Sequence, residues 1–321
     1  MSFPDIQRNP VLFRVPALNA LLLTLAIFVI GALLLGVAMI GGVWWQQERI
    51  AYQPPAEPPT PPVDVRRIDY VAGDGQQLYG YVLDPAATPA GVLIAFHGNA
   101  DLATWQIPWA REVARHTGWC VLLAEYRGYG GLPGTPTYFG VQQDARAAWH
   151  VAQDIARARL ATPAPRFALF GHSLGSGVAM ELAAEIRATH PRAITAVVLQ
   201  SPFTTAREMA RIVSTRPVQV LWKVISRVHY DSRARLGEID APVWIAHGDR
   251  DWLVPVTMGR DLFARARAPG ELLIVRDAGH NDVGHVGGAT YWRWISGALT
   301  AREPDPAVIG SESKFRTGTS G

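Results

Sequence analysis

Short apolar runs and helical patterns alternate along most of the chain. Continuous apolar runs of this length are typical of strands buried on both faces of a parallel sheet. They occur at Gly91–Phe96, Trp119–Ala124, Phe167–Phe170, Ala193–Leu199, Pro242–Ala246 and Leu272–Val275. Apolar residues at helical spacing lie between or after them, at Ala103–His116, Phe139–Leu160, Leu174–Thr189, Val256–Arg267 and Ala289–Leu299. A hairpin is expected before them, from Arg66–Val71 and Leu78–Leu83. The alternation predicts an α/β domain at residues 65–300, with a doubly wound, mostly parallel sheet.

One stretch of this domain, residues 202–240, breaks the alternation. It shows no strand pattern, and apolar residues recur at helical spacing at Val218, Leu221, Ile225 and Val228. The stretch carries seven Lys or Arg residues and four Asp or Glu residues. It is inserted between two strands, on the side of the sheet where ligands bind in open α/β folds. We therefore expect a small helical lid.

A long apolar segment precedes the domain. Ala20–Val43 contains 24 residues, of which Thr24 is the one clearly polar side chain. As a helix it would be about 36 Å long, enough to cross a hydrocarbon core of about 30 Å. Trp44 and Trp45 follow it, as is typical at a membrane interface. A cleaved signal peptide is the alternative, but its apolar region is usually about 7–15 residues long. The sequence predicts an uncleaved transmembrane anchor at residues 20–45, after an N-terminal segment 1–19.

Charges near this span predict its orientation. Arg8 and Arg14 precede the span, and Arg49 follows it closely. Because basic residues favour the cytoplasmic side, the small excess before the span places the N-terminus in the cytoplasm. The catalytic domain is then expected outside the cytoplasm.

Two segments are expected to stand apart from the folded domain. Residues 46–64 include six prolines between Gln53 and Pro62, a composition that favours an extended polyproline II spacer. Deletion through about Pro62 is therefore expected to release an active soluble domain. Residues 301–321 are rich in Pro, Ser, Gly and Thr, and we expect a disordered tail.

Composition narrows the function. The net charge is only +3, from 30 basic and 27 acidic residues, which does not favour nucleic-acid binding. The single cysteine, Cys120, lies in an apolar run and is expected to be a buried structural thiol. No His, Cys or carboxylate spacing indicates a metal site, and no cofactor is expected. The oligomeric state stays open.

The pentapeptide Gly171-His-Ser-Leu-Gly175 carries the strongest chemical signal. It lies between a predicted strand and a predicted helix, the setting in which G-x-S-x-G forms a nucleophile elbow. There Ser173 would project its hydroxyl above the sheet from a strained turn. The two glycines would allow the strand and the helix to pack closely. A serine that merely caps the helix is the alternative.

A serine nucleophile needs a base, and this fold requires the order Ser, then Asp or Glu, then His. The loop after the strand Pro242–Ala246 offers Asp249 and Asp251, and the loop after the next strand offers His280. The order fits either aspartate. His97 and His247 are expected to make local hydrogen bonds instead.

Backbone N–H groups are expected to stabilise the oxyanion of the tetrahedral intermediate. In this arrangement one comes from the residue after the nucleophile, here Leu174. The second comes from the loop after the strand Gly91–Phe96, and Asn99 is the candidate. Each donor is worth about 3–4 kcal/mol.

These motifs together resemble the α/β-hydrolase superfamily, above all the membrane-anchored α/β-hydrolase-domain proteins, whose relatives include acyl-protein depalmitoylases and monoacylglycerol lipases. The matching segments are Phe96–Ala100, Glu125–Gly130, Gly171–Gly175, Ser201–Thr204, His247–Asp251 with Val254-Pro255, and Gly279–Asp282. The resemblance implies the α/β-hydrolase fold, with Asp251 as the acid. It also implies that Tyr126–Gly130 shapes a loop beside the site. Glu125 stands where the family usually has Asp, and the sequence does not show what this difference does.

The sequence therefore predicts a membrane-tethered serine hydrolase that cleaves a carboxylic ester or thioester through an acyl-enzyme. Apolar helical faces in the expected lid favour a lipid or other substrate with an acyl chain over small polar esters. A serine peptidase of the same fold and a non-catalytic membrane scaffold are the alternatives.

Overall fold

The computed structural model describes residues 15–55, 60–160, 162–213, 219 and 226–301. The chain divides into two units, Met1–Gln47 and Glu48–Gly321. The first unit consists of most of helix α1 (Val15–Ala51), whose last residues belong to the second unit. Within α1, Asn19–Arg49 is long and apolar enough to cross a membrane, and none of its most apolar stretch is buried by protein. Its large aliphatic side chains are exposed, so α1 is a candidate membrane span.

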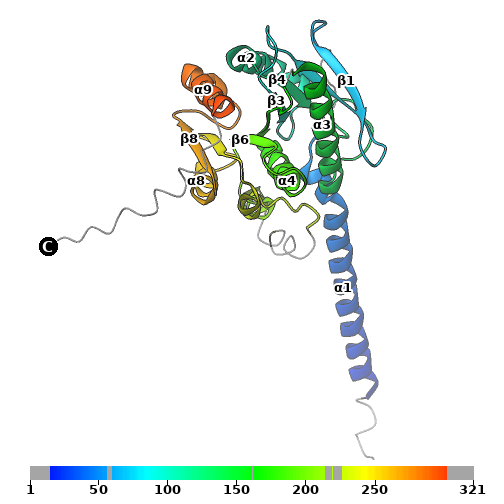
Figure 1. The fold of residues 1–321 in the computed structure, drawn as a ribbon. Coiled ribbons are helices and arrows are strands. Elements are labelled where there is room, and N and C mark those ends of the chain that lie inside the picture. The colour runs from blue at the N-terminus through cyan, green and yellow to red at the C-terminus, as the bar shows by residue number, and fades with distance from the viewer. Residues whose placement is uncertain (1–14, 56–59, 161, 214–218, 220–225, 302–321) are drawn as a thin grey trace, which may run out of the picture. The chain divides into compact units, whose positions relative to one another are not determined.

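The second unit is built on an eight-stranded sheet with the order β1-β2-β4-β3-β5-β6-β7-β8 (Figure 1). The strands are β1 (Arg66–Val71), β2 (Gln77–Leu83), β3 (Val92–Phe96), β4 (Cys120–Ala124), β5 (Phe167–His172), β6 (Ile194–Gln200), β7 (Val243–Gly248) and β8 (Pro269–Val275). β2 pairs antiparallel with β1 and β4, and all other neighbours are parallel. The predicted doubly wound, mostly parallel sheet is confirmed.

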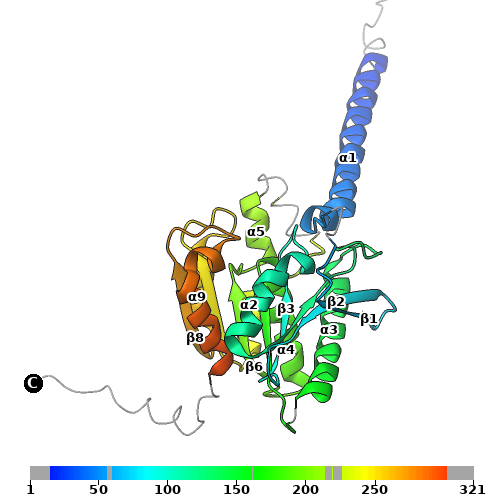
Figure 2. The ribbon, with the colours of Figure 1, turned by 90° about the horizontal axis from the view of Figure 1, so that it is seen from above.

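Helices cover both faces of this sheet (Figure 1; Figure 2). Successive residues of a strand point to opposite faces, so Ile94 and Leu93 of β3 lie in different apolar clusters. The cluster around Ile94 includes residues of α3 (Tyr138–Arg159), α4 (Leu174–Thr189) and α8 (Val256–Arg265). The cluster around Leu93 includes residues of α2 (Ile107–Thr117) and α9 (Val283–Thr300). A single turn, η2 (Ala103–Gln106), precedes α2. Cys120 is buried in the first of these clusters.

The insertion at residues 202–240 contains α5 (Ala206–Val213), α7 (Ser232–Arg235) and the short turn η3 (Leu236–Glu238). Most of the helix expected around Val218–Val228 lies outside the described residues, as does the expected tail from residue 302. Val228 itself is buried.

The start of the folded unit differs from the expected linker at residues 46–64. Glu48–Gln53 belongs to the second unit, and the side chain of Tyr52 is only 2% exposed. Burial of a phenol ring is strongly favourable, and this gain outweighs the extended tendency of the prolines that follow. The segment before Pro54 is therefore part of the domain and no free spacer.

Candidate active site

Ser173 lies at the sharp turn between β5 and α4. Its backbone has φ 51° and ψ −114°, a strained conformation for a residue with a side chain. A Cβ atom on Gly171 would come within 2.2 Å of the Gly175 carbonyl oxygen. A Cβ atom on Gly175 would come within 2.1 Å of the Phe96 carbonyl oxygen. The two glycines are therefore a steric requirement of the close packing that holds Ser173 above the sheet.

His280 faces this serine from the loop after β8. The Ser173 hydroxyl donates to Nε2 of His280 across 2.9 Å, and the imidazole is largely buried. The backbone carbonyl of His280 accepts from Ser201 Oγ at 3.1 Å and from His172 Nε2 at 3.2 Å. Burial and the nearby His280 lower the pKa of His172 to about 4, so His172 is neutral and acts as a donor here. These two bonds fix the main chain of His280.

Asp251 completes a line of hydrogen bonds. His280 Nδ1–H donates to Oδ2 of Asp251 at 2.7 Å. The other oxygen, Oδ1, accepts the N–H groups of Leu253 and Val254 at 2.9 and 2.8 Å. Burial alone would raise the pKa of Asp251, but hydrogen bonds from His247, His280 and Val254 and the charge of His280 lower it well below its usual value. Asp251 is therefore ionised and oriented toward the imidazole.

Asp249 occupies a different place. Its Oδ1 accepts the backbone N–H of Asp277 at 2.7 Å, which ties the loop after β7 to the loop after β8. Asp277 has φ 64°, so this bond supports a strained turn just before His280. Of the two aspartates that the sequence left open, the structure brings Asp251 to His280.

His247 contacts the carboxylate of Asp251. It is fully buried, and its Nε2 lies 2.9 Å from the Val254 carbonyl oxygen and 3.2 Å from Oδ2 of Asp251. The sequence predicted only a local hydrogen bond for this residue. The contact with Asp251 joins residues four apart in one tight loop, which no helical or strand periodicity reveals.

The two N–H groups expected for the oxyanion lie at the same edge of the sheet. Phe96 of β3 pairs with Gly171 of β5, and each strand ends shortly afterwards, before Asn99 and Leu174. Leu174 is the first residue of α4, where the N–H has no intrahelical acceptor. In the described part of the chain, neither the Asn99 N–H nor the Leu174 N–H has an acceptor. The expectation that both groups bind an oxyanion therefore stays a prediction.

A second pair of a histidine and a carboxylate lies beside this edge. His97 Nε2 is 2.7 Å from Glu125 Oε1, and both side chains are almost completely buried. His97 Nδ1–H donates to the Gly98 carbonyl at 2.8 Å, and Glu125 Oε2 accepts the Ala103 N–H at 3.1 Å. Burial alone would lower the pKa of His97, but the charge and hydrogen bond of Glu125 raise it. Glu125 thus joins the ends of β4 and β3 and the loop after β3.

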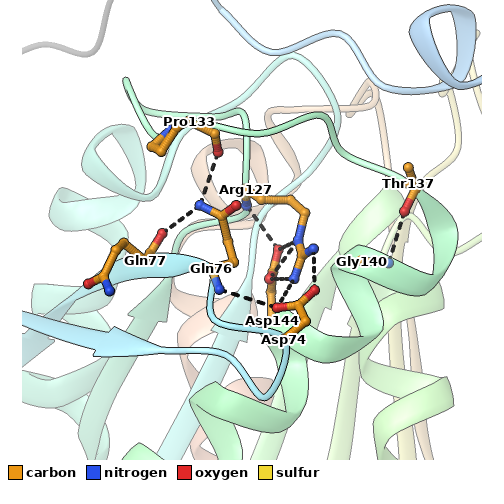
Figure 3. Close-up of polar contacts among 8 residues, drawn as sticks. All are labelled: Asp74, Gln76, Gln77, Arg127, Pro133, Thr137, Gly140 and Asp144. Carbon is orange, nitrogen blue, oxygen red and sulfur yellow. Dashed lines mark hydrogen bonds and ion pairs between the residues drawn. The ribbon is translucent and has the colours of Figure 1, made fainter.

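The loop after β4 is held by Arg127 (Figure 3). Its guanidinium binds Asp144 of α3 at 2.7 Å and Asp74 of the β1–β2 turn at 2.6 Å. The backbone N–H of Arg127 donates to the same Asp144 carboxylate at 2.9 Å. A planar, five-donor fork can bridge two carboxylates in this way, which an ammonium group does less well. Arg127 therefore fixes the loop to helix α3 and to the turn between β1 and β2.

The carboxamide of Asn99 is a feature that the sequence did not reveal. Its Oδ1 accepts the Gln53 N–H at 2.8 Å and the Tyr129 hydroxyl at 2.7 Å, and its Nδ2 donates to the Ala51 carbonyl at 2.9 Å. The only signal in the sequence was Tyr52, an aromatic residue at the edge of a proline-rich stretch.

Within the described ranges, no group of three or more His, Cys, Asp or Glu side chains is arranged to hold a metal ion.

Comparisons with known proteins agree with this fold. Residues 91–224 match the family model of the alpha/beta hydrolase fold. The Mycobacterium tuberculosis protein Rv2307c is 35% identical over 256 residues, which cover 77% of this chain and 84% of that protein. The lysophosphatidylserine lipase ABHD12 of Macaca fascicularis is 29% identical over 222 residues, covering 63% of this chain and 52% of that lipase. The solved esterase Pf2001 of Pyrococcus furiosus has a TM-score of 0.58 and 20% identity, over 77% of this chain and 98% of the esterase. This last likeness carries the fold alone.

Proposed function

The chain belongs to the α/β-hydrolase superfamily, and from that premise we propose that it is a membrane-anchored serine hydrolase that cleaves carboxylic esters or thioesters. A lipase among its relatives supports ester hydrolysis, and esterases among the solved structures share its fold. One observation carries the serine mechanism: an unbroken line of hydrogen bonds from Ser173 through His280 to Asp251.

Acylation begins at the hydroxyl of Ser173. His280 Nε2 takes the proton of Ser173 as Oγ attacks the substrate carbonyl carbon. The carboxylate of Asp251 holds the imidazole tautomer and stabilises the imidazolium that forms. The N–H groups of Asn99 and Leu174 bind the oxyanion, whose charge appears only in the tetrahedral intermediate. His280 then protonates the leaving alcohol or thiol, which departs as the acyl-enzyme forms.

Deacylation reverses these roles with water. His280 removes a proton from water, which attacks the acyl carbonyl, and the second tetrahedral intermediate uses the same two N–H groups. Collapse of this intermediate returns the proton to Ser173 and releases the acid. No metal or cofactor enters the proposed cycle.

An acyl-chain substrate is the class that we propose. The insertion at residues 202–240 combines apolar residues at helical spacing with an excess of basic residues. That composition suits a lid over a substrate with a hydrocarbon chain and an acidic head group. The lysophosphatidylserine lipase among the relatives acts on a substrate of this general kind.

Anchoring and orientation belong to the same proposal. Asn19–Arg49 would span the membrane, with the N-terminus in the cytoplasm and the hydrolase domain outside it. Fusion of alkaline phosphatase after Gly321 tests the orientation. Phosphatase activity supports it, and fluorescence from a reporter that works only in the cytoplasm would reverse it.

A fluorophosphonate probe tests the nucleophile. The full-length chain in detergent should be labelled, and Ser173→Ala should not. A panel of p-nitrophenyl esters, acyl thioesters and aminoacyl amides then tests the bond that is cleaved. A preference for the amides would replace the proposal with a serine peptidase, and absence of labelling would replace it with a non-catalytic scaffold.

A further inference from the structure

The segment Glu48–Gln53 packs into the folded unit to which it belongs. Tyr52 is buried, with its hydroxyl 3.3 Å from the Tyr230 hydroxyl, and its N–H donates to the Glu48 carbonyl at 2.8 Å. Glu48 forms an ion pair with Arg227 at 3.2 Å. Tyr230 and Arg227 both belong to the insertion between β6 and β7. The segment is thus bound to the region that the sequence predicts to cover the site.

The same segment also reaches the loop after β3. Asn99 holds it at two points, through the bond from the Gln53 N–H to Oδ1 and the bond from Nδ2 to the Ala51 carbonyl. The Tyr129 hydroxyl donates to Oδ1 as well. The carboxamide therefore bridges the backbone of the segment and the loop after β4, and its orientation is determined on both sides.

Asn99 is also the residue whose backbone N–H is proposed to bind the oxyanion. The next residue, Ala100, has φ 52°, which an alanine adopts only when its surroundings hold it there. The side-chain bonds of Asn99 provide that hold from one side. The pair His97–Glu125 provides it from the other, through the Gly98 carbonyl.

We propose that Glu48–Gln53 is a positioning element of the oxyanion hole. By fixing the Asn99 carboxamide, the segment fixes the direction of the Asn99 N–H. The inference rests on the proposed serine-hydrolase function and assigns a catalytic consequence to the residues that link the candidate membrane span to the domain. It also reverses the expectation that deletion through Pro62 leaves a fully active domain, because that deletion removes Ala51, Tyr52 and Gln53.

Full-length variants in detergent test this role. Asn99→Ala keeps the backbone N–H and removes all three side-chain bonds. Gln53→Pro removes a single N–H donor without changing Asn99, and Gln53→Ala is its matched variant because it retains that N–H. We expect Asn99→Ala to lower kcat about 10-fold at nearly constant KM, a fraction of the roughly 10²–10³-fold cost of losing an oxyanion donor outright. Gln53→Pro should lower kcat several-fold, and more than Gln53→Ala.

A tetrahedral mimic separates positioning from general loosening of the fold. A trifluoromethyl ketone forms a hemiketal oxyanion with the serine, so its affinity should fall in each variant by the same factor as kcat. A variant that only loosens the fold would lower the melting temperature without lowering the affinity for the ketone. Wild-type kcat and wild-type ketone affinity in both Asn99→Ala and Gln53→Pro would overturn the inference. If Asn99→Ala fails to fold, Gln53→Pro decides alone.

Ser173→Ala in the same assays keeps the two proposals distinguishable. The positioning role alone is refuted if the wild type is active, Ser173→Ala is inactive, and both Asn99→Ala and Gln53→Pro are fully active. Undiminished ester hydrolysis by Ser173→Ala would refute the proposed function, and the positioning role with it.

Discussion

Two buried pairs of a histidine and a carboxylate lie at the same edge of the sheet, and they differ in what faces the second nitrogen of the imidazole. In both pairs a ring nitrogen lies 2.7 Å from a carboxylate oxygen. The other nitrogen of His280 faces the hydroxyl of Ser173, which can give a proton to it. The other nitrogen of His97 faces the Gly98 carbonyl, which can only accept one.

This difference gives the two imidazoles different hydrogen-bonding roles. An imidazole between a carboxylate and a carbonyl must carry a proton on both nitrogens, in agreement with the raised pKa of His97. An imidazole between a carboxylate and a hydroxyl has one nitrogen left as an acceptor, which is what a general base needs. A buried acid–histidine pair is therefore no sign of catalysis until the partner of the outer nitrogen is known.

The sharpest way to break the comparison is to remove each imidazole in turn. His280→Gln should lower kcat by about 10⁴-fold or more, because Ser173 loses its base. His97→Gln should lower it by about 10-fold or less, because it only loosens the loop that carries an oxyanion donor. Initial rates on one p-nitrophenyl ester compare the two. If His97→Gln is the inactive variant, the assignment of the base is wrong.

The two aspartates in the loop after β7 are expected to differ in their effect on kcat in the same way. Asp251→Asn should cost roughly 10⁴-fold in kcat, because the amide selects the wrong imidazole tautomer and cannot stabilise the imidazolium. Asp249→Asn is the matched variant, and it should cost less than about 10-fold, since that side chain contacts the Asp277 N–H instead. Both are measured under saturating substrate. Loss of activity in Asp249→Asn alone would exchange the two roles.

Removing the charge of Glu125 tests whether the pair of His97 and Glu125 stabilises the fold. Glu125→Gln leaves the buried His97 without its counter-ion, and breaking a buried pair by removing one partner costs about 3–5 kcal/mol of the free energy of unfolding. Denaturant unfolding of the full-length chain measures the loss. Asp69→Asn, which breaks an exposed pair with Arg67, should change it by less than about 1 kcal/mol. Equal losses of unfolding free energy in the two variants would contradict a structural role of Glu125.

The smallest effect is expected from His172, whose ring lies 5.2 Å from that of His280. Its pKa is lowered to about 4, whereas an unfolded histidine titrates near pH 6.5. The unfolded chain therefore binds the extra proton first as the pH falls. This group should lower the free energy of unfolding by roughly 1 kcal/mol per pH unit between about pH 6 and pH 4. His172→Gln keeps a donor for the His280 carbonyl and should remove this part of the slope. An unchanged slope in unfolding curves across that range would contradict the assignment.

The sequence pointed to the pair of Asp251 and His280, because the signals for these residues are local. The glycines around Ser173 are required by contacts within one strand–helix turn, and a strand followed by a loop brought Asp251 and His280 to the same edge. The structure extends α9 back to Val283, before the expected Ala289, with a kink at Gly288 where φ is 49°. A glycine can adopt that angle without strain, and this freedom hid the first turn of the helix from a search for regular spacing.

The second pair and the buried start of the domain depend on contacts between distant residues. His97 meets Glu125 only because β4 and β3 are neighbours in the sheet, an order that no local pattern encodes. Tyr52 looked like part of a spacer because the residues after it are mostly proline. Its hydroxyl meets that of Tyr230, which lies 178 positions further along the chain.

That separation has a consequence in time. During synthesis the residues of the candidate membrane span and of Glu48–Gln53 leave the ribosome long before the partner of Tyr52 exists. At about 5–20 residues per second, the 178 residues up to Tyr230 take on the order of 10–40 s to make. Throughout this interval the ring of Tyr52 lacks its contact with Tyr230, whereas the partners of the Asn99 side chain, Ala51, Gln53 and Tyr129, are made earlier. Under the proposed function, the segment Glu48–Gln53 reaches its place only once Tyr230 has been made, so a nascent chain anchored in the membrane stays inactive at least until then.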